Sequence, residues 1–250
     1  MGLIGLFFLD IFWFEKYIIR WPEYDISEGN KDPLKLIQLS DLHIEEMKSF
    51  HRSIAKRINK EKPNILLITG DSVNYPRLLP VFNEFLSLID PTIPKLAIMG
   101  NKEYDGNVDI NSLKKIFENQ NGNLLINENF VFESKTRKLN FIGVDDFIRG
   151  NPDFELASKN VDKSLDSIVL NHCPIYRDEI ERINRNLKVN IKAILSGHTH
   201  GGQITFFGLR VYKISGSGNY LKGWYEGPES KMYVSRGIGT SYFHFRFFAR

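Results

Sequence analysis

The sequence contains a single cysteine, Cys173, among 250 residues. One thiol cannot form an intramolecular disulfide or supply the several thiolates of a cysteine-based zinc site. Basic residues exceed acidic residues by only three, and no basic run of recognition size occurs. Nucleic acid is therefore not an expected partner. Internal repeats, low-complexity tracts and linkers are also lacking, so we expect one main domain with a sizeable core.

Long apolar runs are scarce as well, and the longest lies at the N-terminus. Residues 1–14 are almost wholly apolar and are followed by Lys16 and Arg20. A bilayer span needs about 20 such residues, and a secretory signal needs a basic start and a small-residue cleavage site, which this stretch lacks. We expect residues 1–20 to form an apolar, interfacial membrane anchor. The alternative is a helix packed on the core of the main domain, residues 21–250.

Five short apolar runs predict buried strands, because each is rich in Ile, Leu or Val and bounded by polar residues or glycine. They cover residues 34–39, 65–69, 96–99, 168–170 and 193–195. Between several of these runs, apolar residues at helical spacing predict amphipathic helices. The clearest faces are Phe50, Ile54 and Ile58; Leu113, Ile116 and Phe117; and Ile180, Ile183 and Leu187. Asp109 is expected to cap the second helix. The alternation predicts an α/β fold with largely parallel pairing.

Two further stretches predict additional strands. Residues 123–144 contain apolar runs close together, which indicates antiparallel strands. Aromatic and β-branched runs separated by glycines follow Gln203, at residues 204–207, 211–214, 220–225 and 232–234. A second sheet packed on the first would accommodate them. The expected architecture is two facing β-sheets flanked by helices, a four-layer αββα sandwich.

Potential metal ligands follow each of the five predicted core strands. In chain order they are Asp41 and His43, Asp71, Asn101, His172, and His198 with His200. In open α/β sheets, ligands bind beyond the carboxyl ends of the strands. Four of the six histidines in the chain fall at these ends, and only His51 and His244 do not. The pattern predicts a metal site where the strands end.

The chemistry of these side chains favours two divalent ions. Carboxylate, amide and imidazole ligands without thiolate suit manganese, iron or zinc, and more ligands are present than one ion needs. A carboxylate shared between two ions holds them about 3.5–4 Å apart, an arrangement used for phosphoester hydrolysis. Taken singly, Asp41 and Asn101 have the alternative of capping turns or helices, and His172 that of a hydrogen-bonded core imidazole.

The ordered motifs resemble those of the calcineurin-like metallophosphoesterase superfamily. They are Asp-x-His at 41–43, Gly-Asp at 70–71, Gly-Asn-x-Glu at 100–103, a His before Pro at 172–174 and Gly-His-Thr-His at 197–200. The resemblance covers residues 34 to about 246. Gly-Val-Asp-Asp at 143–146 and the segment 234–241 resemble its bacterial membrane-associated branch. That branch includes phosphodiesterases and some UDP-2,3-diacylglucosamine hydrolases of lipid A synthesis.

The resemblance implies a role for each residue. One metal would be bound by Asp41, His43 and His200, and the other by Asn101, His172 and His198, with Asp71 bridging; manganese is the favoured metal. Glu103 would support these ligands without binding a metal. For Asp145 and Asp146, stabilisation of their own loop stands beside contact with the substrate as an equal alternative.

The sequence departs from the family pattern at Lys102, where the usual motif has histidine. That histidine is assigned to transition-state stabilisation or leaving-group protonation. A lysine ammonium neutralises phosphate charge but is a poor proton donor, because its ordinary pKa is about 10.4. UDP-diacylglucosamine hydrolases of the superfamily can carry arginine here. Lys102 and Asn101 are the expected catalytic residues, and Lys102 favours a substrate with a good leaving group. The alternative is a solvated lysine beside an inert site.

These observations predict a dinuclear-metal phosphohydrolase acting on a membrane-associated phosphodiester or pyrophosphate, such as UDP-2,3-diacylglucosamine. The alternatives are a phosphodiesterase of broader specificity on nucleotides or phospholipids, and a non-catalytic scaffold of the same fold. We expect a peripheral membrane protein on the cytoplasmic face, because an export signal is missing from the sequence. The aromatic tail, residues 242–250, is expected to be a last strand or part of an apolar rim.

Overall fold

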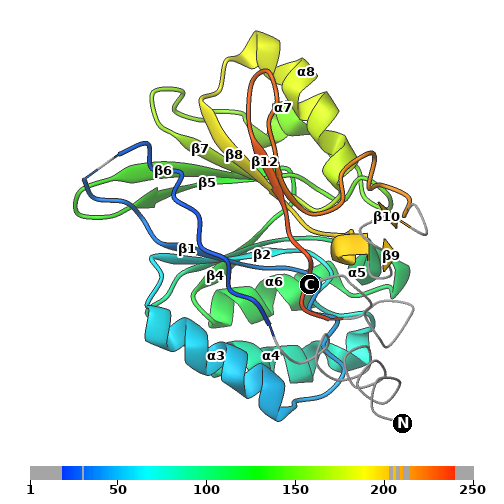
Figure 1. The fold of residues 1–250 in the computed structure, drawn as a ribbon. Coiled ribbons are helices and arrows are strands. Elements are labelled where there is room, and N and C mark those ends of the chain that lie inside the picture. The colour runs from blue at the N-terminus through cyan, green and yellow to red at the C-terminus, as the bar shows by residue number, and fades with distance from the viewer. Residues whose placement is uncertain (1–18, 30, 203–204, 207–208, 211–213, 240–250) are drawn as a thin grey trace.

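Two β-sheets lie face to face in the computed structural model, which describes residues 19–29, 31–202, 205–206, 209–210 and 214–239 (Figure 1). The first sheet has four parallel strands in the order β1-β2-β3-β4. They are β1 (Leu36–Leu39), β2 (Ile65–Thr69), β3 (Lys95–Ile98) and β4 (Gly122–Leu125). Its outer face is covered by α3 (Ser49–Glu61), α4 (Leu79–Ser87) and α6 (Ile110–Asn119).

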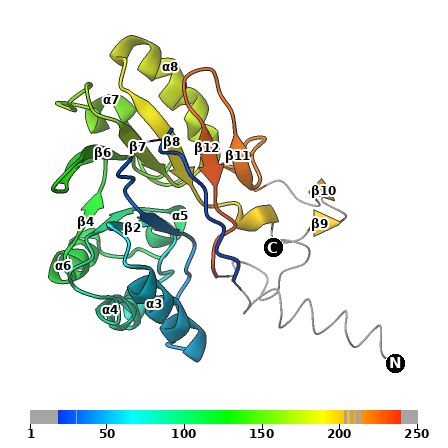
Figure 2. The same ribbon diagram turned by 60° about the vertical axis from the view of Figure 1, so that its left-hand side comes forward.

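The second sheet has six strands in the order β11-β12-β8-β7-β6-β5. They are β5 (Glu128–Glu133), β6 (Lys138–Gly143), β7 (Ser167–Asn171), β8 (Ile191–Ser196), β11 (Gly223–Tyr225) and β12 (Met232–Val234). The four central strands are parallel, and β5 and β11 pair antiparallel at the two edges. The helices α7 (Phe154–Ala157) and α8 (Arg177–Leu187) cover its outer face, so the layers run helix, sheet, sheet, helix (Figure 2).

Shorter elements connect these layers. They are the helix α5 (Asn101–Asp105), the 3₁₀ turns η2 (Pro76–Leu78), η3 (Pro174–Tyr176) and η4 (His200–Gly202), and the two-stranded pair β9 (Thr205–Phe206) and β10 (Leu209–Arg210). The elements α5, η3 and η4 each begin just after a core strand ends. They therefore lie where the sequence predicts the metal ligands.

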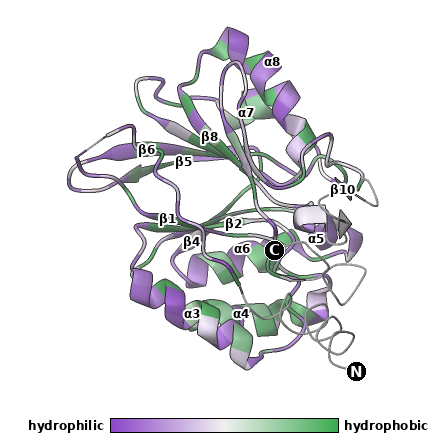
Figure 3. Ribbon diagram, viewed as in Figure 1, coloured by the Kyte–Doolittle hydropathy of each residue, from purple (hydrophilic) through white to green (hydrophobic). Residues whose placement is uncertain are grey.

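Alternation along the strands divides the interior into three apolar layers. On β2, Leu66 and Ile68 pack against the helices of the first sheet, while Ile65 and Leu67 face the second sheet. Both faces of each sheet are covered, which explains why the strands are continuous apolar runs. Figure 3 shows hydrophobic residues along the strands and hydrophilic residues on much of α3 and α8.

The four-layer αββα architecture is confirmed, and two details of the strand assignment are corrected. The runs at 168–170 and 193–195 belong to the second sheet, as parts of β7 and β8. Within 123–144, β4 pairs in parallel with β3, and only β5 and β6 form an antiparallel pair. The reason is that α6 lies between β3 and β4 and returns the chain in the same direction. The predicted cap of α6 is present, because Asp109 accepts a bond of 2.8 Å from Ser112 N.

The two terminal predictions lie outside the described residues. Only Ile19 and Arg20 of the expected anchor are described, and the tail at 242–250 is not. Across the described ranges, no helix combines the length and the apolar character that a membrane crossing requires.

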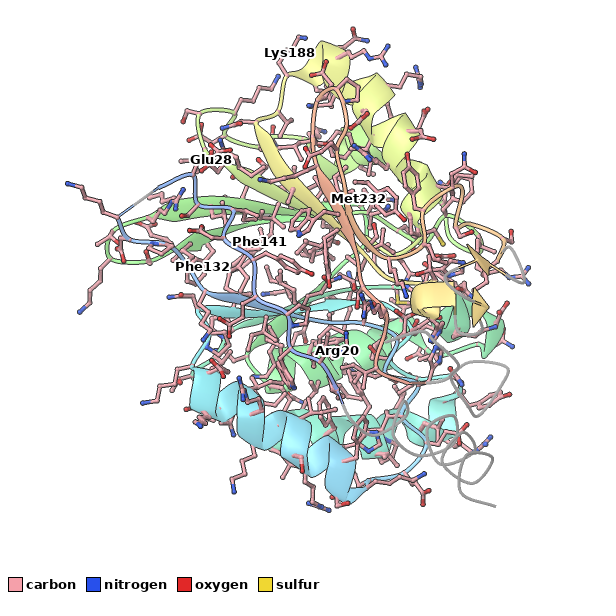
Figure 4. The ribbon with its side chains drawn as sticks, viewed as in Figure 1. Arg20, Glu28, Phe132, Phe141, Lys188 and Met232 are labelled. Atoms are coloured by element: carbon pink, nitrogen blue, oxygen red, sulfur yellow. The ribbon has the colours of Figure 1, made fainter. Side chains whose placement is uncertain are left out.

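Phe141 gives a direct test of the core between the sheets. It lies on β6, is fully buried, and packs with apolar residues of both sheets (Figure 4). We expect Phe141→Ala to lower the free energy of unfolding by about 3–5 kcal/mol, because it removes a large buried side chain and leaves a cavity. Urea titration measures this. Val131→Ala, on the neighbouring strand at a 45% exposed position, should cost about 0.5 kcal/mol or less. Equal losses in both variants would contradict this account of the core.

Candidate metal centre

The ends of five strands from both sheets bring the seven predicted ligands together. Asp41 and His43 follow β1, Asp71 follows β2, Asn101 follows β3, His172 follows β7, and His198 and His200 follow β8. All seven side chains are buried. Backbone bonds join the ends: Asp41 N donates to Gly70 O over 3.1 Å, and Gly197 N donates to His172 O over 3.1 Å. The shared direction of the parallel strands places all five ends at one edge of the sandwich.

The first group of donor atoms comprises Asp41, His43, Asp71 and His200, whose ligand atoms all lie within 4.8 Å of one another. The two imidazole nitrogens, His43 Nε2 and His200 Nε2, are 3.1 Å apart. His200 Nε2 lies 3.5 Å from Asp41 Oδ1, and His43 Nε2 lies 3.7 Å from Asp71 Oδ2. This geometry suits a single cation at the centre of the group.

The second group is built around His172 and meets the first at Asp71. His172 Nε2 lies 3.4 Å from Asp71 Oδ1 and 3.3 Å from His198 Nδ1. Asp71 therefore presents one oxygen to each group. Asn101 adds a further potential metal ligand. Its buried side-chain oxygen, Oδ1, has no hydrogen-bond partner among the described residues. A buried amide oxygen without a partner needs an explanation, and a bound cation supplies one.

Each of the four imidazoles has an inner nitrogen, which faces the other donor atoms of the site, and an outer nitrogen, which contacts a protein oxygen. The partner oxygens are Asn74 Oδ1 for His43 Nδ1 (2.7 Å), Thr69 O for His172 Nδ1 (2.8 Å), Ser215 O for His198 Nε2 (2.5 Å) and Gly239 O for His200 Nδ1 (3.3 Å). Each outer nitrogen is thus placed to donate its proton to an oxygen. The inner nitrogen is then the one that would bind a metal ion in place of a proton, which is the usual second layer of a histidine metal site.

The backbone at the site is held in an unusual conformation. Positive φ angles occur at Asp41 (52°), His43 (43°), Asp71 (53°), His198 (72°) and His200 (50°). Residues other than glycine rarely adopt this left-handed region, and the cost is of order 1–3 kcal/mol each. Five such residues within one set of seven indicate that the fold maintains the arrangement of their side chains against local preference.

Two glycines allow the strand ends to approach closely. A Cβ atom on Gly100 would lie 2.3 Å from Asp71 Oδ1, and one on Gly70, which has a φ of 83°, would lie 2.5 Å from His172 Nδ1. Real Cβ atoms do not approach other atoms so closely. Glycine at these two positions therefore makes room for the shared carboxylate and the imidazole beside it.

Opposite charges shift the ionisation of Asp71 and His172. Burial alone would raise the pKa of Asp71 and lower that of His172. Their mutual attraction and hydrogen bond outweigh burial, so the pKa of Asp71 is held far below its usual range and that of His172 is raised well above its usual range. The carboxylate of Asp71 is thus strongly stabilised by positive charge on the side of the second group.

Glu103 supports the site through hydrogen bonds to the backbone around Asp71, a supporting role that the sequence predicts. Its two oxygens accept backbone N–H groups of Asp71 (3.1 Å), Ser72 (2.5 Å), Val73 (3.2 Å) and Gly100 (3.0 Å). Burial and the charge of Asp71 raise the pKa of Glu103 to about 8, while these backbone donors act in the opposite direction. The side chain joins the loop after β2 to the start of α5.

Removing Glu103 is expected to destabilise the protein. Glu103→Ala would leave four buried N–H groups without acceptors, so we expect a loss of about 3–5 kcal/mol in the free energy of unfolding. Urea titration of the metal-free protein measures the loss without a contribution from metal binding. Glu118→Ala, at an exposed position of α6, serves as the control and should be near neutral. A loss below about 1 kcal/mol for Glu103→Ala would contradict this role.

The structure favours the loop-stabilising alternative for Asp145 and Asp146. Asp146 is fully buried, and its Oδ2 accepts backbone N–H groups of Ile148 (2.8 Å) and Arg149 (2.7 Å). Its Oδ1 accepts the thiol of Cys173 over 3.1 Å. That Asp146 contacts the substrate stays a prediction. Both of its oxygens are used inside the fold.

Sequence reasoning missed several residues of the site. The thiol of Cys173 lies within 4.8 Å of the donor nitrogens of His172 and His198. Burial raises the pKa of that thiol well above its usual value, and the thiol donates to Asp146 Oδ1 over 3.1 Å. Asn74 orients His43 from a loop residue without a motif of its own. Only the folded chain reveals these contacts.

Comparisons with known proteins identify the family of this chain. Residues 34–202 match the family described as calcineurin-like phosphoesterase. The uncharacterized metallophosphoesterase YkuE of Bacillus subtilis is 27% identical over 94% of this chain and 84% of its own length. The UDP-2,3-diacylglucosamine pyrophosphatase LpxG of Chlamydia muridarum is 24% identical over 82% of this chain and 78% of its own length.

A solved structure gives the same result for the fold. A dimetal phosphatase from Danio rerio has a TM-score of 0.52 to this chain at 10% identity, over 83% of this chain and 88% of that protein. At this level of identity the likeness concerns the fold alone. The family match covers the four strand ends that carry Asp41 to His172 and reaches the last pair of histidines. The chain belongs to the calcineurin-like phosphoesterase family.

Proposed function

We propose that this chain is a dinuclear-metal phosphohydrolase. One observation carries the proposal: the carboxylate of Asp71 presents Oδ2 to His43 and Oδ1 to His172, so that one residue joins two groups of donor atoms. Asp41, His43 and His200 hold one divalent ion with Asp71. Asn101, His172 and His198 hold the other with the same residue. Two divalent ions would supply an activated water and Lewis-acid stabilisation of the phosphoryl oxygens.

The surrounding residues fix the geometry of this centre. The outer contacts of the four imidazoles keep the inner nitrogens directed into the site. Glu103 holds the backbone on both sides of Asp71. The orphaned oxygen of Asn101 fits a hard or borderline cation, and the absence of thiolate from the donor set favours manganese, iron or zinc. We favour manganese among these.

Lys102 is placed to receive the phosphate charge of the substrate. Its backbone N–H donates to Asp71 Oδ1 over 2.8 Å, and its Nζ lies 2.9 Å from Asp105 Oδ2. An ammonium group beside the two ions neutralises the charge that develops on the phosphoryl oxygens. Because a lysine is a poor proton donor, this arrangement suits a leaving group that is stable as an anion, such as a phosphate.

We further propose that the substrate is a membrane-associated pyrophosphate, with UDP-2,3-diacylglucosamine as the leading candidate. The relative LpxG carries that activity in its name, and the apolar residues 1–14 are suited to a lipid surface. In the reaction, water adds to one phosphorus and the bridging P–O bond breaks. The products are UMP and an acylated sugar phosphate.

A substrate panel tests this proposal. The full-length protein is supplied with manganese and given UDP-2,3-diacylglucosamine, bis(p-nitrophenyl) phosphate and a cyclic nucleotide, with Asp71→Asn as the background control. We expect release of UMP from the first compound. Cleavage of the cyclic nucleotide without release of UMP would move the substrate to nucleotides. If none of the three compounds were hydrolysed, the non-catalytic scaffold would be favoured. The complete set of donor residues argues against that alternative.

Membrane association is a separate proposal. We propose that residues 1–20 anchor the protein to the cytoplasmic face of a membrane, with residues 21–250 as the metallophosphoesterase domain. Deleting residues 1–14 should shift the protein from the vesicle pellet to the supernatant when it is centrifuged with vesicles containing anionic lipid. Unchanged sedimentation with the vesicles would refute the anchor.

A further inference from the structure

We propose that Arg149 is a second phosphate-binding cation, which acts with Lys102 to bind the two phosphates of a diphosphate ester. The inference rests on the proposed phosphohydrolase function and makes it more specific. Lys102 and Arg149 lie 47 positions apart in sequence, and neither the family motifs nor the donor set includes Arg149. The two cations meet at one carboxylate, that of Asp105.

The helix α5 connects this arrangement to the metal centre. Asn101, an expected ligand, begins the helix, and its Nδ2 lies 3.5 Å from Asp105 Oδ2. The same oxygen accepts Lys102 Nζ over 2.9 Å, and Arg149 Nε lies 2.7 Å from Asp105 Oδ1. The path from Asp71 through Lys102 and Asp105 to Arg149 is therefore a continuous series of contacts.

Hydrogen bonds hold the loop that carries Arg149 against α5. Tyr104 of α5 donates its hydroxyl to Asp145 Oδ1 over 2.6 Å, and Asp145 Oδ2 accepts Asn151 N over 2.9 Å. Asp146 accepts the N–H of Arg149 itself, over 2.7 Å. The loop 145–151 and the helix thus form one wall beside the metal centre. A cation on this wall is presented in a defined position, which is what selective binding requires.

The charges and exposure at this wall suit a second phosphate. The side chain of Arg149 is 56% exposed, whereas that of Lys102 is 19% exposed. A guanidinium carries five N–H donors, and the observed contact is made through Nε, so the rest of the planar fork is suited to bidentate binding of phosphate. A simple phosphodiester has one charged phosphate, which Lys102 serves beside the metal ions. A diphosphate has a second charged phosphate group, for which Arg149 provides the matching positive charge.

Asp105 is a positioning residue in this scheme. Two cations close together repel each other, and a carboxylate between them offsets that repulsion before substrate binds. Asp105 also fixes the distance between the two cations, so that they match the two adjacent phosphates of a diphosphate rather than a single phosphate. Its effect on binding should therefore be larger with ligands that carry two phosphates than with those that carry one.

Binding measurements on the manganese-loaded, full-length protein test the proposal. The probes are uridine 5′-(α,β-methylene)diphosphate, which resists cleavage between its phosphates, and UMP, which has one phosphate. Calorimetry gives the Kd of each. We expect Arg149→Ala to weaken binding of the diphosphate probe about 10- to 100-fold and that of UMP less than about 3-fold. Arg149→Lys should recover part of the loss, because it keeps the charge without the fork.

The controls separate this role from general effects. Arg182→Ala, at an exposed arginine of α8 that pairs with Glu179, should leave both Kd values unchanged. Asp105→Asn should reduce the preference for the diphosphate probe, and adding it to Arg149→Ala should have little further effect. Equal weakening of both probes by Arg149→Ala, or no weakening of either, would overturn the proposal.

Failure of the proposed function is recognised separately. Each protein is also assayed for manganese-dependent hydrolysis of bis(p-nitrophenyl) phosphate, which contains one phosphate. Absence of hydrolysis by the wild type would refute the phosphohydrolase while leaving the two Kd values measurable. Retained hydrolysis with an unchanged ratio of the Kd values would refute only the role of Arg149.

Discussion

Replacing Asp71 with asparagine should lower kcat/KM for bis(p-nitrophenyl) phosphate by at least about 10³-fold, which corresponds to about 4 kcal/mol of transition-state stabilisation. Asp71 is the residue whose oxygens face both groups of histidines, at 3.7 Å from His43 Nε2 and 3.4 Å from His172 Nε2. Asparagine keeps the shape of the side chain but has one acceptor oxygen and no charge. We therefore expect bound manganese to fall from about two equivalents to one or fewer.

The matched control is Asp109→Asn, at the cap of α6. Asparagine caps helices about as well as aspartate, so stability and activity should both be preserved. Circular dichroism establishes that the two variants are folded. If Asp71→Asn kept more than about a tenth of the activity, or kept two equivalents of manganese, the shared-carboxylate account would be wrong.

Replacing Lys102 with alanine should lower kcat/KM for the same ester by about 10²- to 10³-fold, because it removes a cation from the position where phosphoryl charge develops. The ammonium group is held by Asp105 at 2.9 Å, and the backbone N–H of Lys102 is bonded to Asp71. The loss should appear in kcat as well as in KM, since the interaction strengthens as the charge develops.

Lys102→His tests why this chain carries lysine. A histidine, with an ordinary pKa of about 6.5, donates protons readily at neutral pH. We expect this variant to gain activity on esters with poor leaving groups, such as phenyl phosphate, relative to p-nitrophenyl phosphate. The control is Lys114→Ala, at a lysine that pairs with Glu128, and it should resemble the wild type. An unchanged preference between leaving groups in Lys102→His would show that Lys102 does not set it.

Most of the core strands could be predicted from the sequence, because buried parallel strands are continuous apolar runs. The run at 65–69 coincides with β2, and that at 232–234 with β12. The sequence did not assign the strands to sheets, because the same apolar pattern serves either sheet of a sandwich buried on both sides. The parallel pairing of β4 was missed for a similar reason, since direction depends on the crossover helix and not on the strand itself.

The donor residues were predictable because each follows a strand and belongs to a short motif. The residues that orient them were not, because their roles depend on contacts across long sequence separations. Asn74 orients His43 from 31 positions away, and Arg149 meets Asp105 from another loop. The loop contacts of Asp146 were not predictable either, because the sequence does not show which backbone groups a carboxylate accepts.

Metal content and manganese-dependent hydrolysis, measured together on the purified full-length protein, test the central claim most directly. Inductively coupled plasma mass spectrometry gives the bound metal, and bis(p-nitrophenyl) phosphate reports the hydrolysis. The account predicts about two equivalents of divalent transition metal, with activity that is lost on chelation and restored by manganese. Fewer than one equivalent, together with no manganese-stimulated hydrolysis, would contradict it.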